Sequence, residues 1–269
     1  MDAAAASAVV SRLRAAGCVF AEDEAALLME AAPDRAALDL MIARREAGEP
    51  LEVIVGWAEF RGRRVAVETG VFVPRRRTEV LVAAALKHAA SLSGTRAGAP
   101  VVVELCAGVG AVAAALVAEL PGSDVYAGEI DPVAVRAARR NLDPARVFEG
   151  DLYEALPRDL RGGVDILIAN APYVPSGEIA LMPSEARDHE PLVALDGGAD
   201  GLDVQRRVIA SAAEWLAPGG ALLIETSVRQ APGTVSLMED AGLRAVAVHD
   251  DDLDGTAAVG VMPANAAAR

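Results

Sequence analysis

The sequence turns from an apolar run into a glycine-containing loop at Val101-Val102-Val103-Glu104-Leu105-Cys106-Ala107-Gly108-Val109-Gly110. A continuous apolar run of this length predicts a strand buried on both faces, as in parallel sheets. Glycines between such a strand and the alanine-rich segment that follows allow the backbone to approach a ligand closely. The Gly-x-Gly-x-x-Gly spacing of a dinucleotide loop is absent, so this loop need not hold a phosphate.

Strand and helix patterns alternate from residue 100 onward. This alternation predicts an α/β fold with a mostly parallel, seven-stranded, Rossmann-like sheet and helices on both faces. Ligands of such sheets bind beyond the carboxyl ends of the strands. The expected strands are 101–106, 124–129, 146–149, 164–169, 219–226, 243–249 and 256–262.

Acidic residues stand at the expected ends of two further strands. Glu129 ends the second strand, where a carboxylate can accept hydrogen bonds from both hydroxyls of a ribose. Asp151 follows the third strand and could accept from an adenine amino group, while Leu152 could cover the ring. Each position taken singly could be an ordinary strand-end turn. Their order at strand–helix–strand spacing predicts a nucleoside site.

The tetrapeptide Asn170-Ala171-Pro172-Tyr173 directly follows the apolar run 164–169. Because a residue before proline is kept out of helical geometry, the Ala171 carbonyl and the Asn170 carboxamide form a pair of acceptors for a planar NH2 group. An Asn-initiated turn after a strand is the alternative interpretation. The segment 172–203 is expected to be long and irregular, and we take it as a candidate lid over a substrate.

Together these residues resemble the class I S-adenosylmethionine-dependent methyltransferases of the protein-glutamine type (the PrmC/HemK family). The resemblance covers nearly the whole chain and implies transfer of a methyl group to a glutamine of a peptide chain release factor. Further matches are Arg44-Arg45-Glu46-Ala47-Gly48-Glu49-Pro50, Val73-Pro74-Arg75 with Thr78-Glu79, Glu190-Pro191, Ala194-Leu195 and Gly201-Leu202.

The resemblance also implies a division of labour among the residues. It implies a helical domain over 1–48, a β-hairpin linker over 49–72 and a methyltransferase domain over 73–269. The catalytic residues would be Asn170, Ala171, Pro172 and Tyr173. S-adenosylmethionine, and its product S-adenosylhomocysteine, would be bound by Glu104, Cys106, Ala107, Gly108, Gly110, Glu129, Ile130, Asp151, Leu152 and Asn170.

Three departures from the family pattern predict a related clade with an altered target. The family tetrapeptide is usually Asn-Pro-Pro-Tyr, whereas Ala171 stands second here, and Cys106 replaces the first glycine of the loop. We expect Cys106 to have a negative φ and to be a tolerated substitution rather than a nucleophile. The segment before Arg44 is about one helix shorter than the family's helical domain. Glu225 resembles a family position near the site, although a helix-capping role fits it equally.

Upstream of the loop, helices are expected at 2–16, 22–31 and 34–47. A hairpin is expected around Gly62, with 53–55 and 65–67 as its two arms. The basic clusters 61–64 and 75–77 concentrate positive charge where the small domain meets the large one, and we interpret most of them as a solvated face.

Composition favours a cytoplasmic enzyme. The 269 residues carry a net charge of −14, which disfavours nucleic acid as a direct ligand. The N-terminus lacks the basic flank of a signal peptide, and no window is a membrane span. The three histidines have no metal-ligand spacing, and two cysteines suggest no disulfide framework. Trp57 and Trp215 fit core positions, and Asp250, Asp251, Asp252 and Asp254 fit a solvated turn.

Two other functions remain compatible with the sequence. The same tetrapeptide could hold the exocyclic amino group of a nucleic-acid base that is drawn from the stack, or of a small molecule. A protein that binds the cofactor without catalysis is the other alternative.

Overall fold

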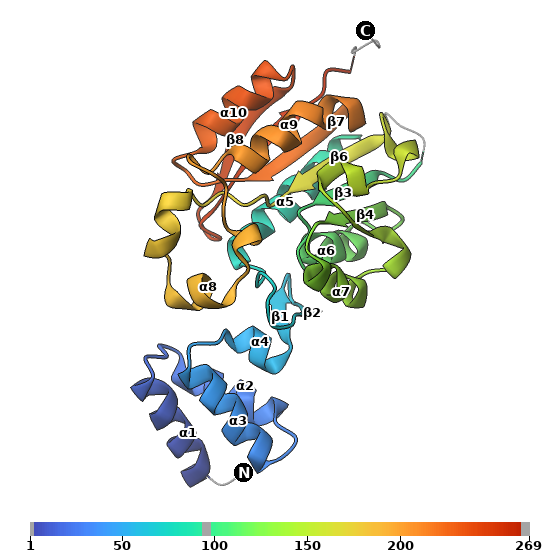
Figure 1. Ribbon diagram of the computed structural model, residues 1–269. Coiled ribbons are helices and arrows are strands. Elements are labelled where there is room, and N and C mark those ends of the chain that lie inside the picture. Colours follow the sequence, from blue (N-terminus) through green and yellow to red (C-terminus); the bar gives the residue numbers. More distant parts are fainter. Residues whose placement is uncertain (1–2, 93–97, 265–269) are drawn as a thin grey trace.

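The computed structural model describes residues 3–92 and 98–264 (Figure 1). Its large domain is built on a seven-stranded sheet in the order β5-β4-β3-β6-β7-β9-β8, in which β9 runs opposite to the other six strands. The mostly parallel, seven-stranded sheet predicted from the sequence is therefore confirmed. The strands are β3 (Val101–Leu105), β4 (Asp124–Glu129), β5 (Val147–Glu149), β6 (Val164–Ala169), β7 (Leu216–Glu225), β8 (Arg244–Asp250) and β9 (Gly255–Val261).

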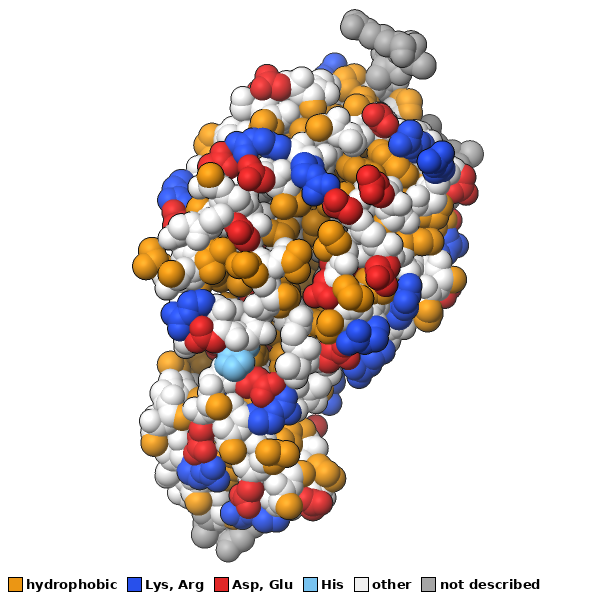
Figure 2. Space-filling model, in the orientation of Figure 1, with side chains coloured by type: hydrophobic (Ala, Val, Ile, Leu, Met, Phe, Trp, Pro, Cys, Tyr) orange, Lys and Arg blue, Asp and Glu red, His pale blue; other side chains and the backbone are white. Residues whose placement is uncertain are grey.

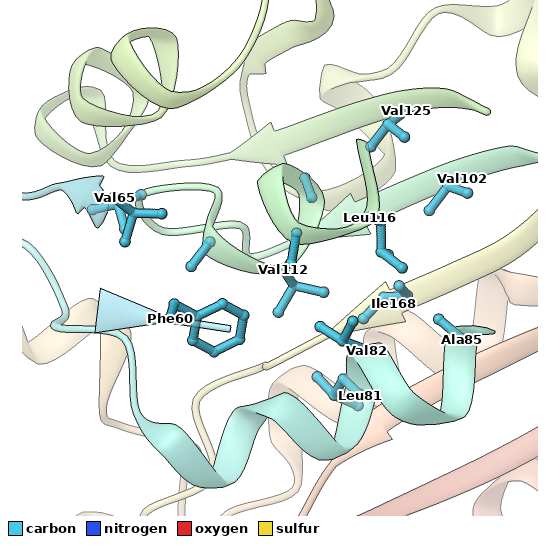
Figure 3. Close-up of a cluster of buried hydrophobic side chains, with 14 of the residues drawn as sticks. Phe60, Val65, Leu81, Val82, Ala85, Val102, Val112, Leu116, Val125 and Ile168 are labelled. Atoms are coloured by element: carbon cyan, nitrogen blue, oxygen red, sulfur yellow. The ribbon is translucent and has the colours of Figure 1, made fainter. Parts of the chain in front are cut away.

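Helices cover both faces of the sheet because successive side chains of a strand point to opposite sides. Val102 packs in the core formed with α5 and α6, whereas its neighbour Val103 packs in the core formed with α9 and α10. Figure 3 shows the first of these cores, in which Val112 and Leu116 of α6 and Leu81 of α5 belong to one cluster on the same side of the sheet. The helices of this domain are α5 (Glu79–Leu92), α6 (Ala111–Glu119), α7 (Pro132–Asn141), α8 (Ser184–His189), α9 (Asp203–Trp215) and α10 (Ala231–Asp240).

The three helices predicted at the N-terminus are confirmed as α1 (Ala3–Ala15), α2 (Ala21–Ala31) and α3 (Arg35–Glu46). They bury a small core of their own that includes Leu13, Leu28, Leu38 and Ile42. Asp34 caps α3 by accepting a hydrogen bond from the Ala37 N–H at 2.8 Å. A side-chain cap of this kind satisfies one of the unpaired N–H groups at a helix start.

The first arm of the predicted hairpin is wrong. The hairpin pairs β1 (Trp57–Phe60) with β2 (Arg63–Ala66), whereas residues Leu51–Val55 form the short helix α4. Gly56 ends α4 in the left-handed region with φ +83° and donates its N–H to the Glu52 carbonyl. The two buried residues of α4, Val53 and Ile54, lie in two different cores, so tertiary packing overrides the β-propensity of this β-branched run.

The segment 172–203 is more ordered than predicted. It contains α8 and the 3-10 helices η5 (Ser176–Leu181) and η6 (Leu192–Ala194). Its two ends meet at a neck, where the Val174 N–H donates to the Leu195 carbonyl and the Gly197 N–H donates to the Val174 carbonyl, at 3.0 and 2.9 Å. We call the chain between Val174 and Gly197 the excursion. It is a compact loop with closed ends rather than an irregular connection.

A glycine is required four residues after the neck. Gly201 has φ +76°, and a Cβ placed there would lie 2.3 Å from the Tyr173 carbonyl oxygen. No other residue could pass so close to the backbone of the tetrapeptide. Over residues 3–92 and 98–264, no helix has both the length and the apolar character needed to cross a membrane.

Candidate active site

A pocket opens beyond the carboxyl ends of β3, β4 and β6, where an α/β sheet is expected to bind its ligand. It is lined by the predicted site residues Glu104, Cys106, Ala107, Gly108, Glu129, Ile130, Asp151, Leu152, Asn170, Ala171, Pro172 and Tyr173. Gly110 was predicted with them but does not line the pocket. It is the N-cap residue before α6, with φ +73°, and a Cβ there would lie 2.7 Å from Leu142 Cδ1, so this glycine allows close packing against α7 and its C-cap.

Glu129 ties the glycine loop to the end of β4. Its Oε2 accepts from the Gly108 N–H at 2.7 Å, and its Oε1 accepts from the Ile130 and Asp131 N–H groups at 2.8 and 2.9 Å. Burial raises the pKa of this carboxyl, and the three backbone donors oppose that shift. The carboxylate is thereby held rigidly at the pocket wall.

Glu104 is the most deeply enclosed acid of the pocket, with 3% of its surface exposed. Its Oε2 accepts from the Ala113 N–H in the first turn of α6 at 2.8 Å. Burial raises the pKa of Glu104 to about 8, since one backbone donor offsets only part of the desolvation and the Glu129 charge opposes ionisation.

Asp151 and Leu152 form the next stretch of the pocket wall. Asp151 Oδ2 accepts from Arg207 Nη2 at 2.6 Å, which places a cation from α9 beside the pocket. Leu152 follows with φ +49°, a left-handed conformation that is unfavourable for a residue with a Cβ. The turn directs the Leu152 side chain into the pocket lining.

The tetrapeptide is held through both of its polar side chains. Asn170 Nδ2 donates to Thr78 Oγ1 at 3.3 Å, and the Tyr173 hydroxyl donates to Glu225 Oε1 at 3.1 Å. Because the amide nitrogen of Asn170 is used by Thr78, its Oδ1 remains available as an acceptor for a ligand. Ala171 between them is buried, with 1% exposed.

Glu225 connects the two anchors. It ends β7 beside β6 and is 2% exposed, and burial raises its pKa while the Thr78 hydroxyl, Arg77 and the Tyr173 hydroxyl lower it. A buried carboxylate needs such donors. The sequence left two roles open for Glu225, and its contacts place it near the site. It is not a helix cap, because it ends β7 and the next helix, α10, begins only at Ala231.

Most arginines of the two basic clusters are exposed, as interpreted from the sequence, but two of them also contact buried acids at the site. Arg75 Nη2 lies 2.5 Å from Oε1 of the buried Glu190, and Arg77 Nε lies 3.6 Å from Glu225 Oε1. Glu190 Oε1 also accepts from the Val73 N–H at 3.1 Å, so one carboxylate joins the excursion to the segment before α5. Arg75 and Glu190 are far apart in the sequence, so no local sequence pattern predicts this ion pair.

No family model matches the chain. A release factor glutamine methyltransferase of Streptomyces coelicolor is 43% identical over 187 residues, which cover 69% of this chain and 65% of that protein. One from Bifidobacterium longum is 36% identical and is matched over 90% of this chain and 92% of its own length. The chain belongs to the release factor glutamine methyltransferase family. The family resemblance inferred from the sequence is thus confirmed.

Two further proteins bear on this methyltransferase. A 4-amino-L-phenylalanine/4-methylamino-L-phenylalanine methyltransferase of Streptomyces pristinaespiralis is 39% identical over 75% of this chain and 69% of that protein. A methyltransferase structure from Pyrococcus furiosus superposes with a TM-score of 0.54 over 85% of this chain and all of that chain, at 14% identity. The latter shows a shared methyltransferase fold.

The conformation predicted for Cys106 is wrong. Cys106 has φ +52°, followed by Gly108 at +55° and Gly110 at +73°, because the loop must reverse direction between β3 and α6 within a few residues. The position therefore does use the conformational freedom of glycine. Burial and the neighbouring carboxylate of Glu129 raise the pKa of the Cys106 thiol, which disfavours a thiolate nucleophile.

Replacing Cys106 tests this backbone conformation. We expect Cys106→Gly to be more stable than Cys106→Ala by about 1 kcal/mol, since both lose the thiol and only alanine retains the left-handed strain. The free energies of unfolding are measured by urea denaturation. An alanine variant as stable as the glycine variant would contradict a positive φ at this position.

Glu104 gives the methyltransferase a predictable pH dependence. Between its ordinary pKa of 4.5 and its folded pKa of about 8, the folded state binds a proton that the unfolded chain has lost. Stability should therefore fall as the pH rises from 5 to about 8. Glu104→Gln keeps an acceptor for the Ala113 N–H, and its Tm should fall less over this range. If the Tm values of the two proteins change with pH by the same amount, the pKa of Glu104 in the folded protein is near its ordinary value.

Proposed function

We propose that this chain transfers a methyl group from S-adenosylmethionine to the side-chain amide nitrogen of a glutamine in a peptide chain release factor or a related protein. The observation that carries the proposal is the acceptor pair of the tetrapeptide, with Asn170 Oδ1 left free by the Thr78 contact. The names of the relatives support the same substrate class. A cytoplasmic location, predicted from the sequence, accords with such a substrate.

The pocket suits a cationic nucleoside cofactor without phosphates. Acids outnumber bases in its lining, which also includes the apolar side chains of Ile130 and Leu152. The acids are Glu104, Glu129, Asp131, Asp151 and Glu190, and the bases are Arg75, Arg77 and Arg207. We assign Glu129 to the ribose hydroxyls, Asp151 to the adenine amino group and Leu152 to the adenine ring. A Cβ added to Gly108 would meet no atom within 4 Å, so the loop leaves open space here for a ligand.

The chemistry requires an amide nitrogen to act as a nucleophile although its lone pair is delocalised. When bound, the cofactor would supply an electrophilic methyl group on sulfur, whose carbon–sulfur bond would break as the carbon–nitrogen bond forms. Asn170 Oδ1 and the Ala171 carbonyl each accept one N–H of the substrate amide. They hold the nitrogen in line and stabilise the positive charge that develops on it. Positioning of this kind can contribute roughly 7–11 kcal/mol.

The remaining residues of the site keep this geometry fixed. The proton of the methylated nitrogen can leave to water afterwards, so no strong base is needed. Ala171 supplies its carbonyl as well as proline would, because the acceptor belongs to the backbone. Tyr173, fixed by Glu225, offers its ring as one wall of the substrate channel.

An amino acid with an aromatic amine is the second candidate substrate. One relative is named as a methyltransferase of such a compound, and the acceptor pair would hold any planar NH2 group. The apolar lining by Phe72, Pro74 and Met182 could cover an aromatic ring. Methylation of a nucleic-acid base and binding without catalysis stay as the other outcomes of the test below.

Asn170→Ala should lower the single-turnover rate of methyl transfer by about 10²–10³, because it removes an acceptor that acts chiefly in the transition state. Cofactor affinity, measured by calorimetry, should change far less. The assay uses a bacterial release factor with labelled S-adenosylmethionine, and mass spectrometry locates the methyl group. Ala171→Pro, which keeps the carbonyl, is the matched control and should retain the parental rate.

The proposal fails if Asn170→Ala transfers methyl groups at the parental rate. Faster transfer to 4-amino-L-phenylalanine than to the release factor would favour the second candidate. Tight cofactor binding with no transfer to protein, RNA or aromatic amines would favour a non-catalytic role.

Thr78 is a positioning residue for Asn170, and Thr78→Val tests this role. Loss of the hydroxyl leaves the Asn170 amide free to rotate, so we expect kcat to fall up to about tenfold, the value of one hydrogen bond. Cofactor affinity should not change. Thr78→Ser keeps the hydroxyl and should keep most of kcat, whereas a purely steric role would impair the serine variant, which lacks the methyl group, and spare the isosteric valine variant.

A further inference from the structure

A second groove lies apart from the candidate active site, between the hairpin, α6 and α7. Four arginines line it, in a chain whose net charge is −14. One acid, Asp143, is among its lining residues. Figure 2 shows basic side chains gathered over α7, on the side of the large domain that adjoins the hairpin. We call it the arginine groove; its basic residues are Arg63, Arg64, Arg140 and Arg146.

The walls of the arginine groove are fixed to one another. Asn141, at the end of α7, donates to the carbonyls of Ala66 and Val109 at 3.0 and 2.8 Å and accepts from the Ala66 N–H at 2.7 Å. Arg61, in the turn of the hairpin, donates through Nε to Glu119 Oε1 at the end of α6 at 2.9 Å. The hairpin is thus fastened to both helices, and the groove is preformed.

The positive charge of the groove is only partly neutralised. Arg63 is exposed and pairs with no carboxylate of residues 3–92 or 98–264 within 4.0 Å, and Arg140 reaches Glu68 only at 4.0 Å. Arg64 lies over the Trp57 ring at 3.9 Å, and its Nη2 is 3.5 Å from Glu30 Oε1. Arg146 lies over the Tyr126 ring at 4.4 Å, and its Nη2 is 2.7 Å from Asp124 Oδ1. Stacking and these ion pairs hold the two guanidinium planes in place. Arg63 and Arg140 are thus the groove cations that are least neutralised, and a guanidinium edge suits bidentate contact with a carboxylate.

The floor of the groove is apolar. It is formed by Val65, Ala114, Val117, Ala118, Val125 and Leu142. Val117 is 53% exposed, so the floor presents apolar surface to an occupant. An occupant should therefore combine carboxylates with an apolar side chain.

We propose that the arginine groove docks an acidic segment of the protein substrate, with carboxylates on Arg63 and Arg140 and an apolar side chain on the floor. This inference rests on the proposed function for the identity of the partner. Single-stranded nucleic acid would need open aromatic faces for base stacking. Here the two rings, Trp57 and Tyr126, each carry an arginine, and Tyr126 also stacks with Phe148.

The test compares the parental enzyme with Arg63→Glu/Arg140→Glu, and with Arg63→Gln/Arg140→Gln as a milder pair. Both positions are exposed, so the fold should persist, and thermal unfolding checks this. Arg158→Glu, at another exposed position, is the matched control. One probe is a fluorescent peptide in which leucine is flanked by glutamates; the other is a fluorescent single-stranded RNA. Binding is followed by anisotropy at low and at physiological salt.

We expect the charge-reversed pair to bind the acidic peptide at least about tenfold more weakly, and the control to bind it normally. With the intact release factor, the pair should raise KM, whereas kcat for a short glutamine peptide should stay unchanged. The proposal is overturned if the charge-reversed variant binds the acidic peptide as tightly as the parental enzyme, or if its KM for the release factor is unchanged. Tighter binding of the RNA than of the peptide would also overturn it. The peptide assay needs no methyl transfer, so failure of the proposed function would be seen separately.

Discussion

Buried carboxylates at strand ends determine how the loops of this protein are arranged. Such groups are stable inside a protein only when hydrogen-bond donors reach them. Glu104 takes the N–H of Ala113, Glu129 takes the N–H of Gly108, and Glu225 takes the hydroxyl of Tyr173. Each acid therefore fixes a different wall of one pocket. The sheet supplies the acids side by side, and their need for donors draws the loops into place.

The sheet was predictable because each strand carries a local apolar signal with little competition. The seven expected strands match the observed ones to within a few residues, and the tetrapeptide lies where β6 ends. The strand predicted at 53–55 was wrong because its local signal competes with tertiary packing. The β-branched side chains there favour a strand locally, but Gly56 and burial in two cores make a helix the better solution.

Other features of the site depend on contacts between distant segments, which a single sequence does not display. The left-handed Cys106 follows from the sharp turn between β3 and α6 rather than from its own preference. The pairing of Arg75 with Glu190 joins positions more than a hundred residues apart, as does that of Arg77 with Glu225. Thr78 belonged to a recognised motif, yet only the fold shows that it meets Asn170.

The closed neck of the excursion has an evolutionary consequence. Because Val174 and Gly197 lie side by side, the chain between them could be lengthened, shortened or exchanged while the strands on either side keep their register. The chemistry of the tetrapeptide sits outside this module, and the module carries part of the surface that a substrate would meet. The choice of methyl acceptor could thus change through replacement of the excursion alone, while the residues that carry out methyl transfer stay the same.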